Sequence, residues 1–131
     1  MQYGILKFNL IRAKAHAYGT NCLLAVLWKD GEITDYAFLP GDMPGYQWMT
    51  DYRTDMPEFE SAPDRSNPDK SGLDAETDYQ NILYLRKGWT GQGVFTTSFY
   101  GKIFVREGKI WLEPDNGHYN SYLVHYNPYW K

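Results

Sequence analysis

Cysteine is almost absent from this sequence, and its single cysteine, Cys22, excludes an intrachain disulfide framework. Cys22 lies in an apolar run, which indicates an inert buried thiol. The chain also lacks an apolar run near the length that a membrane-spanning helix needs. Its first residues do not follow the basic, apolar, small-residue order of a secretory signal. We therefore expect a cytoplasmic protein that makes no membrane contact.

Basic residues are not in excess. The chain has 13 Lys and Arg against 16 Asp and Glu, which gives a formal net charge of −3. Contacts with nucleic-acid phosphates need a basic surface. We therefore do not expect direct binding to nucleic acid.

Motifs for catalysis and cofactor binding are missing as well. The sequence has no Walker loop, no dinucleotide fingerprint, no His-Glu-x-x-His and no paired-cysteine metal motif. The positions of His118 and His125 differ by seven, an odd number, so an unbroken strand would point them to opposite faces. The sequence favours a non-enzymatic protein and predicts no cofactor and no metal site.

Aromatic residues, in contrast, are abundant at 18%, with 12 Tyr and 5 Trp. The stretch 94–113 predicts a β-hairpin around a two-residue turn at Glu107-Gly108. This turn places Phe104 opposite Trp111 and Arg106 opposite Lys109. Side chains alternate along each strand, so one face is expected to be core and the other to carry an aromatic stripe. The core face holds Phe95, Phe99, Ile103, Val105, Ile110 and Leu112, and the stripe holds Tyr100, Phe104 and Trp111.

A second hairpin is predicted around Asp30-Gly31, between the apolar run 22–28 and residues 33–39. Pairing Trp28 with Ile33 would place Leu27 opposite Thr34 and Leu23 opposite Phe38. The continuous apolar run suits a strand that is buried on both faces.

The remaining segments complete the expected fold. Residues 3–18 show helical spacing that stops at a glycine, and this predicts an N-terminal helix. Residues 79–87 and 118–126 read as strands, and 40–78 as a long irregular insertion rich in proline and acids. The expected architecture is α+β, a single domain over 1–131 with the N-terminal helix packed on an antiparallel sheet of about six strands. The alternative is a small all-β barrel in which residues 3–10 form a strand.

Three groups of aromatics are candidates for binding a ligand or a partner. The stripe is either covered core or an exposed contact surface. The C-terminal tail either covers a sheet edge or docks on a partner. The candidates are Tyr100, Phe104 and Trp111 in the stripe, Tyr129 and Trp130 in the tail, and Trp48 and Tyr52 in the insertion.

Two functions fit these residues. The first is a non-enzymatic accessory module that binds a protein partner or forms a homodimer through the stripe or the tail. The second is a small-ligand or carbohydrate binder, or an enzyme, with a pocket under the 40–78 insertion. That pocket would use Trp48, Asp51, Tyr52 and His125.

The run GWTGQGVFTTSFYGKIFVREGKIWLEPD, residues 88–115, resembles the middle of the XisI-like family of factors that control excision of a DNA element. The matching residues are the pair Gly88-Trp89 and the run Gly108-Lys109-Ile110-Trp111, with Glu107 in place of the family's Asp. The resemblance covers roughly a quarter of the chain. It implies an α+β fold, no catalysis by this chain, and an accessory role beside a nuclease-like partner, in dimeric form.

Overall fold

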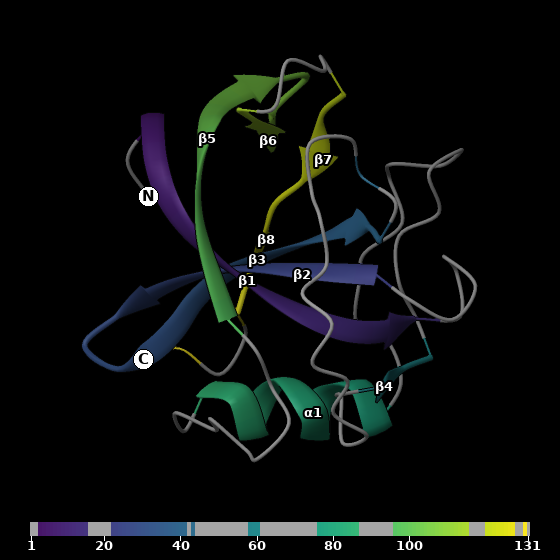
Figure 1. The fold of residues 1–131 in the computed structure, drawn as a ribbon. Helices are drawn as coiled ribbons and strands as arrows, with labels where there is room; N and C mark the ends of the chain where they lie inside the picture. Colours follow the sequence, from purple (N-terminus) through teal and green to yellow (C-terminus); the bar gives the residue numbers. More distant parts are fainter. Residues whose placement is uncertain are drawn as a thin grey trace.

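A computed structural model describes residues 3–15, 22–41, 43, 58–60, 76–86, 96–115, 120–127 and 130. Most of these residues lie in antiparallel strands, and Figure 1 shows that the strands curve around a common interior. The strands are β1 (Gly4–Ala15), β2 (Cys22–Lys29), β3 (Glu32–Pro40), β4 (Glu58–Phe59), β5 (Thr96–Arg106), β6 (Lys109–Pro114), β7 (Tyr122–Leu123) and β8 (His125–Tyr126), and the described helix is α1 (Glu76–Arg86).

The predicted α+β class is wrong, because the described elements form a nearly closed, barrel-like antiparallel sheet with one short helix. The expected N-terminal helix is the strand β1, and the strand expected over 79–87 is most of the helix α1. The alternative interpretation, an all-β barrel that begins with a strand, is nearer to the observed arrangement.

The pattern of burial in β1 explains why its sequence resembles a helix. Its first half buries Phe8 and Leu10 on one face, whereas its second half buries Ile11, Ala13 and Ala15 on the other. The alternation of side chains is regular, but the face that is buried changes between Leu10 and Ile11. Apolar residues therefore do not keep one period of two along the strand, as a half-buried strand would require.

The strands follow the order β7-β6-β5-β1-β2-β3-β8. Within it, β5-β1-β2-β3 has the spatial order of a Greek key, in which a fourth strand returns to lie beside the first. The short strands β7 and β8 are neighbours in sequence, yet β7 pairs with β6 and β8 pairs with β3. One C-terminal segment therefore connects the two edges of the sheet and brings the barrel close to closure.

Two apolar clusters lie on opposite faces of the sheet. The inner cluster fills the barrel with side chains that include Phe8, Leu23 and Leu112. The outer cluster lies between the β1-β2-β3 sheet and a covering layer, to which α1 contributes Ile82 and β4 contributes Phe59. Because both faces are buried there, β2 is apolar from Cys22 to Trp28 and β3 from Tyr36 to Leu39.

Both predicted turns are confirmed. The central residues have positive φ in each, 54° and 78° at Asp30-Gly31 and 55° and 74° at Glu107-Gly108. Two positive φ angles are the signature of the type I′ turn that suits two-residue hairpins. The predicted register of the β5–β6 hairpin is confirmed from Ile103 opposite Leu112 to the turn.

The register predicted for the β2–β3 hairpin is wrong beyond Trp28 and Ile33. A β-bulge follows this pair, with Thr34 as the extra residue, so Leu27 lies opposite Asp35 and not Thr34. The shift then places Leu23 opposite Leu39 in place of Phe38. The Thr34 hydroxyl donates a 2.8 Å hydrogen bond to Asp35 Oδ2.

The predicted core face of the β5–β6 hairpin is correct for Ile103 and Leu112, but not for Val105, which is 51% exposed. The β1–β5 ladder ends at Gly4 opposite Ile103, so Val105 lies beyond it. Phe95 and most of the 40–78 insertion lie outside the described residues. The assignment of a single domain stays a prediction.

Candidate functional site

One face of the paired strands β1 and β5 carries exposed apolar side chains. In the β1–β5 ladder, Ile5 lies opposite Lys102 and Lys7 lies opposite Tyr100. Residues directly opposite each other share a face, so these four side chains form one square. Ile5 is 75% exposed and Tyr100 is 57% exposed, and Tyr3, next to Gly4 at the start of β1, is 61% exposed. We call Tyr3, Ile5, Lys7, Tyr100 and Lys102 the outer face.

The outer face continues a face of β1 that is covered elsewhere. Ile5 and Lys7 are on the same side of the strand as Ile11 and Ala13, because their positions differ by even numbers. Ile11 and Ala13 belong to the cluster that α1 and β4 cover. In Figure 1, α1 lies at the lower end of the sheet, and the first half of β1 and most of β5 rise away from it. The covering layer thus ends part of the way along β1, where the outer face begins.

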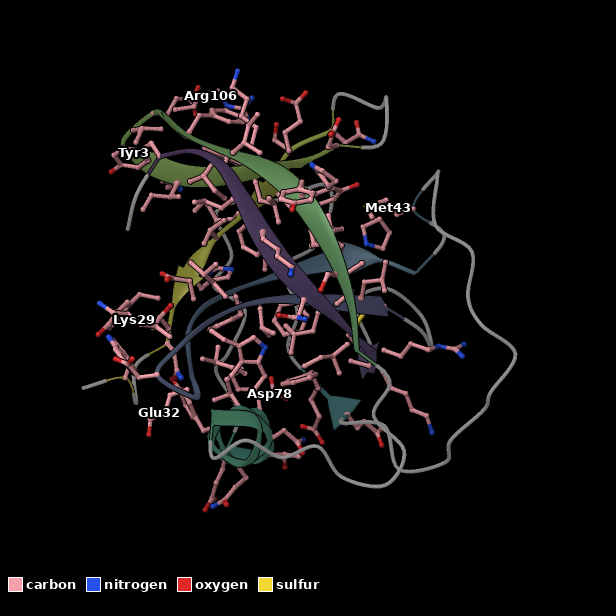
Figure 2. The ribbon with its side chains drawn as sticks, turned by 60° about the vertical axis from the view of Figure 1, so that its left-hand side comes forward. Tyr3, Lys29, Glu32, Met43, Asp78 and Arg106 are labelled. Atoms are coloured by element: carbon pink, nitrogen blue, oxygen red, sulfur yellow. The ribbon has the colours of Figure 1, made fainter. Side chains whose placement is uncertain are left out.

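Cations lie over the aromatic rings near the turn of the β5–β6 hairpin. Lys102 Nζ is 5.9 Å from the centroid of the Phe104 ring, and the Arg106 guanidinium carbon is 5.7 Å from the same centroid. Arg106 is closer to Trp111, with its guanidinium carbon 4.3 Å from that ring. These distances are in the range of cation–π interactions. Figure 2 shows Arg106 and Tyr3 at the same end of the molecule.

The predicted stripe is exposed to different extents along its length. Tyr100 is exposed, Phe104 is partly buried, and Trp111 is only 4% exposed. The Trp111 indole N–H donates a 3.0 Å hydrogen bond to the Arg106 carbonyl oxygen, and Leu123 of β7 pairs with Trp111 across the sheet. Trp111 therefore supports the hairpin, and Tyr100 is the stripe residue that reaches the surface.

The structure describes only one of the two tail candidates. Trp130 is partly buried, and its backbone N–H donates a 3.1 Å hydrogen bond to the Asn127 carbonyl oxygen. Its own carbonyl oxygen accepts a 3.2 Å hydrogen bond from the Tyr126 hydroxyl. Tyr129, Trp48 and Tyr52 lie outside the described residues, as does Asp51. The predicted ligand pocket under the insertion is untested.

Sequence reasoning missed Tyr3, Ile5 and Lys7, because they lie in the segment that was assigned to a helix. The signal that would have found them is the alternation of Ile5, Lys7 and Asn9 with Leu6, Phe8 and Leu10. Such alternation is typical of a half-buried strand.

Two described titratable groups of the interior, the Cys22 thiol and the His125 imidazole, have pKa values shifted by burial. Burial raises the pKa of the Cys22 thiol to about 12, so the nucleophilic thiolate is strongly disfavoured. Burial also lowers the pKa of His125 to about 4. The His125 ring stacks on Tyr36 with 5.2 Å between ring centroids, and its buried Nε2 has no hydrogen-bond partner in the described structure. Among the described residues, no group of three or more His, Cys, Asp and Glu side chains is arranged to hold a metal ion.

In the described part of the chain, no helix is long and apolar enough to cross a membrane. Comparisons with known proteins identify no family for this chain. Neither a protein-family model, nor a curated protein, nor a solved structure matches the chain.

Proposed function

We propose that this chain is a non-enzymatic module that binds a protein partner through the outer face. The observation that carries the proposal is the exposure of Ile5 and Tyr100 on a sheet face whose continuation is covered by α1 and β4. Exposed apolar side chains that gather on one face are typical of contact sites. The enclosed states of Cys22 and His125 favour binding over catalysis.

The resemblance of residues 88–115 to the XisI-like family extends this proposal to an accessory role. Of the matching residues, the described ones are Gly108 to Trp111, which form the end of the β5–β6 turn and the start of β6. A nuclease-like protein or a second copy of the chain would then be the partner on the outer face.

Affinity co-purification from the native source tests the proposal. The tagged wild-type chain is compared with the double variant Ile5→Ser/Tyr100→Ser and with a control, Tyr126→Ser. Tyr126 is 60% exposed, but it lies on β8, which is separated from β1 by β2 and β3 in the strand order. We expect a defined partner with the wild type and the control, and its loss with the double variant.

Thermal unfolding of the three proteins separates lost binding from lost folding. Because the substituted side chains are more than half exposed, we expect stabilities within about 1 kcal/mol of the wild type. Equal recovery of the same partner by the double variant and the wild type would refute the role of the outer face.

A further inference from the structure

The outer face and its surroundings are locally basic although the whole chain is acidic. Lys7, Lys102 and Arg106 are exposed, and Lys109 lies across the ladder from Arg106. The acidic side chains nearest along these strands are Glu113, opposite Lys102, and Glu107 in the turn. Cations thus outnumber carboxylates here, against a net charge of −3 for the full chain.

Charged and apolar side chains alternate within the square of four residues. Lys7 and Lys102 occupy one diagonal, and Ile5 and Tyr100 occupy the other. Diagonal neighbours in an antiparallel pair are about 7–8 Å apart. Alternate side chains of an extended peptide are about 7 Å apart, because each residue adds about 3.3 Å. An extended segment with acidic residues at alternate positions therefore matches the spacing of the two lysines.

We propose that the occupant of the outer face is an acidic segment of a partner protein, with carboxylates at alternate positions. This inference rests on the proposed function and adds the chemistry of the partner. The carboxylates pair with Lys7 and Lys102, and the side-chain methylenes of the same acidic residues contact Ile5 and Tyr100, because the residues between them point to the opposite face. The segment docks through side chains, because β1 and β5 already pair with each other across the square, and β6 pairs with β5 from Gly101 to Arg106.

A protein segment fits this face better than a single strand of nucleic acid. Ile5 is the most exposed large apolar side chain described, and it has no aromatic ring on which a base could stack. The negative charge of the whole chain repels a polyanion at long range, whereas a short acidic segment needs only local complementarity. Five-stranded Greek-key barrels nevertheless include oligonucleotide binders, so the test contains a nucleic-acid arm.

Fluorescence anisotropy with three labelled probes tests the inference. The probes are a ten-residue peptide of alternating Glu and Leu, the same peptide with Gln in place of Glu, and a ten-nucleotide oligothymidine. Binding is measured at low ionic strength, where the Debye length is about 30 Å, and again at about 0.15 M salt. The proteins are the wild type, Lys7→Glu/Lys102→Glu, and the control Lys29→Glu.

Lys29 is a matched control because it is exposed at the β2–β3 turn, and Figure 2 shows it well away from Tyr3 and Arg106. We expect the Glu peptide to bind the wild type and Lys29→Glu alike. The double variant should bind it at least about tenfold more weakly at low salt, because two attractions become repulsions. The Gln peptide should bind all three proteins weakly.

Two results of the anisotropy assay would overturn the inference. One is equal binding of the Glu peptide by the double variant and by Lys29→Glu. The other is oligothymidine binding tighter than peptide binding and lost in the double variant, which would assign the face to nucleic acid. If co-purification loses its partner with Ile5→Ser/Tyr100→Ser but not with Lys7→Glu/Lys102→Glu, the proposed function stands and the acidic partner is rejected.

Discussion

His125 shows how the position of one residue in the fold changes its chemistry. Its ring stacks on Tyr36 where β8 pairs with β3, and its Nε2 is buried without a hydrogen-bond partner in the described structure. Burial disfavours the charged imidazolium, which is why the pKa falls from 6.5 to about 4. In the folded state this histidine is therefore neutral above about pH 4.

The lowered pKa predicts a loss of stability in acid. Between about pH 6.5 and about pH 4 the unfolded chain binds a proton at His125 that the folded chain does not. The free energy of unfolding should therefore fall as the pH drops through this window, by about 2–3 kcal/mol from this group, and its contribution should level off below about pH 4. Urea unfolding at several pH values across the window measures the fall.

The variant His125→Phe isolates this effect, because it keeps an aromatic ring against Tyr36 and cannot titrate. Its stability should fall less than that of the wild type over the same window. The neighbouring Asp35 has a raised pKa through burial, so its protonation favours the folded state in both proteins. Identical pH profiles for the two proteins would rule out His125 as the source.

At the scale of secondary-structure elements, the two hairpins were predictable because their turns are local. Asp30-Gly31 and Glu107-Gly108 set the pairing next to them, and neither pairing depends on distant residues. The register predicted for the β2–β3 hairpin failed beyond one pair, because the facing apolar run 22–28 is compatible with either register. The exposure of Tyr100 and the burial of Trp111 were not predictable, because they depend on which layer covers each strand.

The helix α1 was misread because Ile82 to Leu85 is a short apolar run, which fits a strand as well as a helix. Acidic residues in the first turn, Glu76 and Asp78, were the available helix signal, since they interact favourably with the positive end of the helix dipole. Asp78 also has a tertiary role. Its Oδ1 accepts a 2.7 Å hydrogen bond from the Glu60 backbone N–H, next to β4.

The contact between α1 and the segment after β4 gives a prediction at this scale. Asp78 is fully buried, so Asp78→Ala should leave the Glu60 N–H without this partner and lower the free energy of unfolding by about 1–3 kcal/mol. Asp78→Asn keeps an oxygen acceptor and should cost less. Denaturant unfolding measures both variants, with Glu76→Ala as the exposed control in the same turn. Equal losses for Asp78→Ala and Glu76→Ala would show that the buried hydrogen bond contributes nothing measurable.

At the scale of the whole molecule, the near-closure of the barrel depends on one short segment, β7 and β8. It pairs with β6 at one edge of the sheet and with β3 at the other. The Val124 N–H donates a 2.9 Å hydrogen bond to the Ile110 oxygen on the β6 side, and the Asn127 N–H donates one of 2.9 Å to the Thr34 oxygen on the β3 side. The sequence predicted an unbroken strand over 118–126. In the structure this segment is interrupted at Val124, between β7 and β8. The local sequence does not show the interruption, because it arises where the segment changes its partner from β6 to β3, and both partners are distant in the sequence.

Asn127 should be the residue on which this closure depends most. It is fully buried, and its Nδ2 donates a 2.8 Å hydrogen bond to the Ile33 oxygen in addition to the backbone bond to Thr34. Asn127→Ala removes the amide that connects the segment to β3, and we expect the free energy of unfolding to fall by about 1–3 kcal/mol. The exposed Asn120 is a matched control from the same part of the chain, and Asn120→Ala should change stability by less than about 0.5 kcal/mol.

Amide hydrogen exchange then shows where the loss acts. If the segment holds the barrel edges together, the Val124 amide should exchange faster in Asn127→Ala than in Asn120→Ala, because a local opening of the segment requires less free energy than global unfolding. Unchanged exchange at Val124, together with equal stability of the two variants, would mean that the edges hold without the Asn127 side chain. The paired ladders β1–β2 and β1–β5 would then suffice to keep the sheet curved.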